Sequence, residues 1–187
     1  HEGSGKSTLN RFYRKLGKDG CKGVEAVACD GANGYIGSTR EYLKNAMIVL
    51  DHFHVKHYLN DALDTVRKEE LKKAQSEGNG ELVELLHCNQ RFIMMRNKDT
   101  QRKKDLLERL SFLNERIYKA MLLKEQFLTT YAAGNRKEAS INIREWIITA
   151  IKSKIKSFVE LGHKFFRKRH YPELLCEQDN KCNIRRD

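Results

Sequence analysis

Two short apolar runs near the start of the chain, each closed by an aspartate, stand out in the hydrophobic pattern. Residues 24–29 (VEAVAC) end at Asp30, and residues 46–50 (AMIVL) end at Asp51. Apolar runs of this length predict strands that are buried on both faces, which is typical of a parallel sheet. We therefore expect two parallel strands with a crossover between them.

The segment that joins the two runs is just long enough for such a crossover. It begins as a glycine-rich loop over residues 31–37 and continues into a short helix over residues 38–43. Parallel strands need a connection of roughly a dozen residues or more. If the strands are neighbours, Asp30 and Asp51 emerge at the same carboxyl edge, where open α/β sheets place their sites. Metal chemistry and helix capping both stay open for this pair, and Asp51 precedes an amphipathic stretch that it is placed to cap.

Helical periodicity dominates the rest of the chain. It predicts helices at these positions: residues 6–16, 53–74, 81–86, 100–112, 114–132, 136–151 and 154–167. The apolar run at residues 91–95 fits a helix or a strand equally well. The expected fold class is therefore α/β, with a mixed core over residues 1–74, a mostly α-helical region over 75–172 and an irregular tail over 173–187.

The composition favours a polyanionic partner. The 187 residues include 36 Lys and Arg against 25 Asp and Glu, a net charge of +11, which points to nucleic acid first and an acidic membrane surface second. Five cysteines without short-spaced pairs indicate a reducing compartment. No apolar run approaches the ~20 residues of a membrane span, so we expect a cytoplasmic protein that does not enter a membrane. The chain starts without Met, and a two-stranded sheet is too small to stand alone, so we expect a fragment.

Further residues are candidates for binding. The sequence GSGKST at residues 3–8 resembles the end of a phosphate-binding loop, so a P-loop nucleotidase fragment is one alternative. A non-catalytic basic module that binds nucleic acid is a second. Histidines at positions 52, 54 and 57 cluster behind Asp51, but no cysteine pair completes a four-ligand metal set. Two basic runs are candidate phosphate contacts, and their residues are Arg102, Lys103, Lys104, Arg167, Lys168 and Arg169.

The segments around the two aspartates also resemble a known family. Residues 27–30 (VACD) and 41–55 (EYLKNAMIVLDHFHV), with the continuation over residues 58–70, are similar to the core of insertion-sequence transposases of the ISL-three family. Residues 123–127 and 145–147 resemble that family's helical region. The likeness extends over roughly residues 1–175, and its most specific part is the Asp-His-Phe-His segment with the helix that follows.

This resemblance implies a DDE transposase with a partial RNase H-like core and a helical insertion. Asp30 would match the second catalytic aspartate and ligate the metal, Mg²⁺ or Mn²⁺, whereas Asp51 and His54 match motif positions without an assigned role. The first aspartate would precede residue 1, and no Asn-Gly-x-x-Glu-Gly-x-Asn stretch supplies the last glutamate. The implied partner is DNA, as transposon ends and target, and homo-oligomerisation is left open. Because one carboxylate cannot hold the two metal ions of this chemistry, we expect the chain to be inactive alone.

Overall fold

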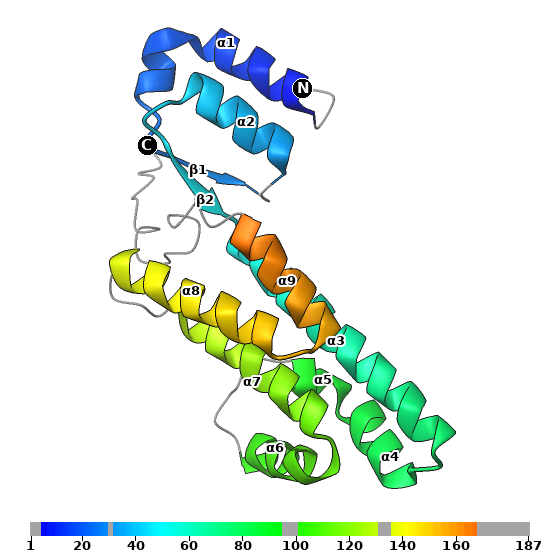
Figure 1. Cartoon of the computed structure of the whole chain (residues 1–187). Coiled ribbons are helices and arrows are strands. Elements are labelled where there is room, and N and C mark those ends of the chain that lie inside the picture. Colours follow the sequence, from blue (N-terminus) through cyan, green and yellow to red (C-terminus); the bar gives the residue numbers. More distant parts are fainter. Residues whose placement is uncertain (1–4, 30–31, 95–100, 131–135, 168–187) are drawn as a thin grey trace.

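The computed structural model describes residues 5–29, 32–94, 101–130 and 136–167, which form a small α/β part followed by a larger helical part (Figure 1). The chain is mostly helical. In chain order the elements are α1 (Lys6–Lys22), β1 (Ala26–Cys29), α2 (Asn33–Tyr42), β2 (Met47–Leu50), α3 (His52–Ser76), α4 (Gly80–Cys88), α5 (Gln90–Met94), α6 (Gln101–Leu113), α7 (Glu115–Thr130), α8 (Arg136–Lys152) and α9 (Lys156–Arg167).

The two predicted strands are neighbours and parallel, as the sequence indicated. They pair in a register that begins with Ala26 opposite Met47 and ends with Cys29 opposite Leu50. The expectation that both faces would be buried is wrong for β1. Alternate residues of a strand point to opposite faces, and α1 and α2 both lie on one side of the sheet (Figure 1). Ala26 and Ala28 therefore remain exposed among the described residues, whereas Cys29 is buried.

Two helices extend beyond the bounds that the sequence predicted. α2 begins at Asn33, so Gly34 and Gly37 are helical, and Gly34 lies beside Lys6 of α1. α1 continues to Lys22 across a kink at Gly17, which has φ 75° and ψ 172°. A positive φ of this kind is readily adopted only by glycine.

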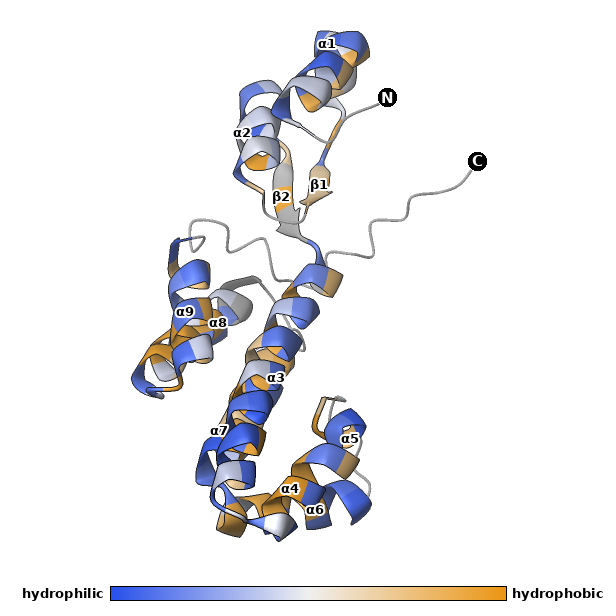
Figure 2. Cartoon of the chain, turned by 90° about the vertical axis from the view of Figure 1, so that its right-hand side faces the viewer, coloured by the Kyte–Doolittle hydropathy of each residue, from blue (hydrophilic) through white to orange (hydrophobic). Residues whose placement is uncertain are grey.

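α3 connects the sheet to the helical part. A single residue, Asp51, separates it from β2, and it runs for 25 residues, about 38 Å. Along this length it packs against α9, α7 and α4 in turn, and α8 packs against α7 and α9. The α/β part lies at one end of α3 and helices α4 to α6 lie at the other in both views (Figures 1 and 2).

Trp146 of α8 lies at the centre of the helical core. Its side chain is fully buried, and its indole Nε1 donates a hydrogen bond of 2.7 Å to the Leu123 carbonyl. The ring meets Phe127 edge-on with centroids 4.6 Å apart, and Phe165 of α9 packs against both. These aromatic contacts join α7, α8 and α9 into one unit.

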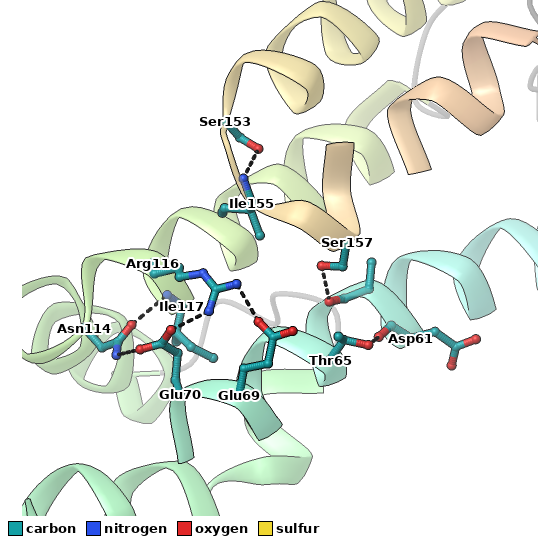
Figure 3. Close-up of polar contacts among 11 residues, drawn as sticks. Asp61, Thr65, Glu69, Glu70, Asn114, Arg116, Ile117, Ser153, Ile155 and Ser157 are labelled. Atoms are coloured by element: carbon teal, nitrogen blue, oxygen red, sulfur yellow. Dashed lines mark hydrogen bonds and ion pairs between the residues drawn. The ribbon is translucent and has the colours of Figure 1, made fainter. Parts of the chain in front are cut away.

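A polar network joins α3 to the start of α7 (Figure 3). Glu70 accepts hydrogen bonds of 2.6 Å from both Asn114 and Arg116, and Arg116 also bonds Glu69. Asn114 in turn accepts from the backbone N–H of Ile117 in the first turn of α7. Burial alone would raise the pKa of Glu70, but the bonds from Asn114 and Arg116 outweigh it and hold that pKa below its usual value.

Candidate functional site

The carboxyl ends of β1 and β2 meet at one edge of the sheet. Cys29 pairs with Leu50 at the ends of the strands, and its carbonyl accepts a hydrogen bond of 2.8 Å from the Asp51 N–H. The main chain thus brings residues 29 and 51 into direct contact, and Asp30 is the next residue along the chain. Asp30 itself lies outside the described residues, so its role as a catalytic and metal-binding carboxylate stays a prediction.

Both carboxylate oxygens of Asp51 have partners at the start of α3. One oxygen accepts a 2.9 Å hydrogen bond from the Phe53 N–H, which makes Asp51 the N-cap of α3. The other lies 2.8 Å from Nδ1 of His54. A carboxylate at this place also interacts favourably with the helix dipole. The sequence left capping and metal chemistry open for Asp51, and the structure shows the cap.

His54 is held beside the sheet edge by this contact. Its side chain is about half exposed, and the carboxylate of Asp51 orients the ring through Nδ1. Within the described part of the chain, the ring's Nε2 has no protein partner. His57 belongs to a separate pair, with its Nε2 3.2 Å from Asp61. The two histidines therefore do not converge.

The described residues contain no group of three or more His, Cys, Asp or Glu side chains that could hold a metal ion. Asp51, the carboxylate seen at the sheet edge, is already engaged by Phe53 and His54. Divalent metal chemistry needs a set of oxygen ligands that converge. The described residues do not form that set.

The resemblance to a phosphate-binding loop lies only partly within the described residues, since residues 3 and 4 are outside them. Gly5 is the N-cap of α1 and Lys6 is the first helical residue. The Lys6 ammonium lies 3.6 Å from the Glu41 carboxylate, in an exposed ion pair with α2. The lysine that a nucleotidase would place on a phosphate is therefore directed to another helix.

The residues of the first candidate basic run differ in their exposure to solvent. Arg102 is exposed, with its guanidinium 4.0 Å above the centre of the Phe92 ring, and Lys104 is also exposed. Lys103 is buried, and its ammonium donates a 2.8 Å hydrogen bond to the Phe92 carbonyl. This placement argues against a phosphate contact by Lys103, because its charge is used inside the protein.

The second basic run is described only at its first residue. Arg167 is exposed at the end of α9, and its Nε donates a weak hydrogen bond of 3.4 Å to the His163 carbonyl. Lys168 and Arg169 lie outside the described residues. Their predicted contact with DNA stays a prediction.

Sequence analysis missed a second buried lysine. Lys124 of α7 is 4% exposed, and its ammonium donates to the carbonyl of Met94, the last residue of α5. Burial lowers the pKa of Lys124 to about 8, which Glu125 partly opposes. The sequence pattern could have predicted this burial, because Lys124 lies at helical spacing on the same apolar face as Ile117, Met121 and Leu128. The ambiguous run at residues 91–95 is helical up to Met94, and the two lysines bind its last carbonyl groups.

Comparison with known proteins identifies the family. Residues 1–175 match the family model of DDE transposases of the ISL-three (ISL3) type, described as transposase. The chain belongs to this transposase family, as its sequence motifs indicated. It is 26% identical over 188 aligned positions to the transposase for insertion sequence element IS1557 of Mycobacterium tuberculosis, in both the CDC 1551 / Oshkosh and the H37Rv strains.

The aligned region covers 89% of this chain and 42% of each of those two transposases. The chain thus spans less than half the length of the curated relatives that it matches. No solved structure matches it. Among the described residues, no helix is both long and apolar enough to cross a membrane.

Proposed function

We propose that this chain forms part of the catalytic region of a DDE transposase that cleaves and transfers DNA strands at transposon ends. Residues 1–74 would belong to an RNase H-like core and residues 75–172 to a helical insertion. The observation that carries the proposal is the hydrogen bond between Asp51 N–H and the Cys29 carbonyl, at the carboxyl edge of a parallel strand pair. It supports a place for Asp30 at the edge where α/β folds bind their substrates.

Asp30 is the proposed catalytic carboxylate. An aspartate offers the hard oxygen ligand that Mg²⁺ and Mn²⁺ prefer, and membership of the family implies a divalent metal. A divalent metal would supply charge stabilisation at the reacting oxygens, and holding it would take several carboxylates. We propose that Asp30 supplies one of them and that the chain alone does not cleave DNA.

Asp51 and His54 are proposed as positioning residues at the same edge. Asp51 fixes the start of α3 relative to β1 and holds the His54 ring through Nδ1. With Nδ1 bonded to Asp51, the Nε2 of the half-exposed ring is an acceptor when the ring is neutral and a donor to a phosphate oxygen when the ring is protonated. Neither residue needs to bind a metal for this role.

DNA is the proposed partner, and the net charge of +11 supports it. Among the residues of the two basic runs, Arg102, Lys104 and Arg167 are exposed and able to reach phosphates. Lys168 and Arg169 are proposed to act with them, and Lys103 is left out because it is buried.

The test is a strand-cleavage assay with the transposase that carries these residues. Asp30→Asn should abolish metal-dependent cleavage and leave DNA binding largely intact, because asparagine keeps the size and loses the charge that holds a metal. Asp51→Asn is the comparison variant: asparagine keeps the N-cap of α3 but removes the carboxylate charge that holds His54. Full cleavage by the Asp30 variant, with loss in the Asp51 variant, would show that the wrong aspartate was chosen. DNA binding without any metal-dependent cleavage would favour the simple basic module.

A further inference from the structure

A pocket of about 700 Å³ lies at the end of the sheet opposite to Asp51. Its walls come from the middle and end of α1, from the last residues of α2 and from the turn between α2 and β2, the segments that lead into the amino ends of the strands (Figure 1). The lining residues are Tyr13, Arg14, Gly17, Lys18, Cys21, Lys22, Glu41, Tyr42, Lys44 and Asn45. The pocket is therefore separate from the proposed catalytic edge.

The kink at Gly17 shapes one wall of the pocket. With φ 75° and ψ 172°, this residue interrupts α1, and the helix resumes in a new direction at Lys18. Gly17 lines the pocket together with Lys18 and Lys22 from the resumed helix and Arg14 from the turn before it. The kink thus brings cationic side chains from both sides of the break to one cavity.

The lining carries an excess of positive charge. Four of its side chains are cationic, whereas Glu41 is its one carboxylate, and Glu41 already pairs with Lys6. Lys22 pairs with Asp19 at 3.1 Å. Lys18 and Lys44 are exposed and have no carboxylate partner in the described part of the chain. Like charges that are held together without counter-charges attract an anion.

Stacking and hydrogen bonds hold the aromatic rings and one guanidinium of the pocket in place. Tyr13 and Tyr42 stack with centroids 5.6 Å apart, and the Tyr13 hydroxyl lies 3.1 Å from the hydroxyl of buried Thr39. The Nε of Arg14 donates a 2.9 Å hydrogen bond to the Tyr42 hydroxyl. This bond leaves the two terminal amino groups of the guanidinium, which have no acceptor among the described residues, to bind a phosphate in a bidentate manner.

We propose that this pocket is a phosphate-binding site, in which Arg14, Lys18 and Lys44 bind the phosphate. Its volume is that of a typical small-ligand site and accommodates one nucleotide. Two sources share this chemistry, a phosphodiester of bound DNA and the phosphates of a free nucleotide. The first is favoured by the DNA partner proposed above and by the net charge of +11; that choice of source rests on the proposed function, whereas the phosphate site does not.

The experiment compares two double variants of the full chain that remove the same charge. Lys18→Gln with Lys44→Gln removes the two pocket lysines, and Lys72→Gln with Lys152→Gln removes two exposed lysines elsewhere. DNA binding is measured over a range of salt concentrations for both. The slope of log Kobs against log salt should fall in magnitude by about 1.8 in the pocket variant, about 0.9 for each lost phosphate contact, and stay unchanged in the control. Inorganic phosphate and ATP are titrated against the same proteins by calorimetry.

Each outcome decides a different point. A reduced slope in the pocket variant alone supports a DNA phosphate in the pocket. Binding of ATP that only the pocket variant loses, with equal DNA slopes, supports the site and assigns it to free nucleotides. Equal slopes in both variants, with no ATP or phosphate binding lost in the pocket variant, overturn the proposal. If the chain binds no DNA at all, the proposed function loses support, while the ATP and phosphate titrations still decide the pocket.

Discussion

Replacing Lys124 by methionine tests whether the buried positive charge of this lysine lowers the stability of the helical core. The side chain is 4% exposed and its ammonium donates to the Met94 carbonyl at the end of α5. Lys103 donates to the neighbouring Phe92 carbonyl, so two cations share one helix end. Methionine has a similar volume and no charge, which isolates the electrostatic contribution of Lys124.

The direction of the pH dependence follows from the lowered pKa. Burial brings the pKa of Lys124 from 10.5 to about 8, so between these values the unfolded chain binds more protons than the folded one. The free energy of unfolding of the wild type must therefore rise with pH in that window. Relative to the Lys124→Met variant, the free energy of unfolding of the wild type should rise by about 2 kcal/mol between pH 7 and 9.5. This is the larger part of the about 3 kcal/mol expected once the pH has passed both pKa values.

The assay is urea unfolding followed by tryptophan fluorescence. Trp146 is the one tryptophan of the chain and is fully buried, so it reports on the helical core. Wild type, Lys124→Met and the exposed control Lys72→Met are compared from pH 7 to 9.5. The difference between wild type and Lys124→Met should grow with pH, and that between wild type and Lys72→Met should stay flat. A constant difference for Lys124→Met would refute the assignment of a buried, proton-losing lysine.

Two further variants probe the other polar contacts. Glu70→Gln should destabilise the chain by about 2 kcal/mol at neutral pH, because Arg116 loses a buried carboxylate partner, and urea unfolding measures this loss. Since the pKa of Glu70 is lowered in the folded chain, the wild type should also lose stability as the pH falls below 4.5, and the variant should lose less. Asp51→Ala removes the N-cap of α3 and should lower the free energy of unfolding by about 1 kcal/mol. Asp51→Asn should keep most of the wild-type stability, and thermal unfolding of both variants measures the difference. An alanine variant as stable as the wild type would contradict the capping role.

The sequence by itself determined the parallel strand pair and the place of its edge. Apolar runs that end in Asp30 and Asp51, separated by a crossover of suitable length, allow few other arrangements, and the register from Ala26 to Cys29 agrees with them. The family was likewise available from the motif around Asp51. Local pattern suffices here because strand pairing and capping depend on residues that are close in sequence.

Tertiary structure alone decided which polar residues are available to a ligand. Lys103 and Lys104 are neighbours in one basic run, yet one is buried on a carbonyl of α5 and the other is exposed. Likewise, no sequence pattern joins Arg14 to Lys44, and only the kink at Gly17 and the packing of α1 on α2 bring them to one pocket. The physical reason is that burial and charge compensation depend on contacts between different helices, which periodicity along one helix does not contain.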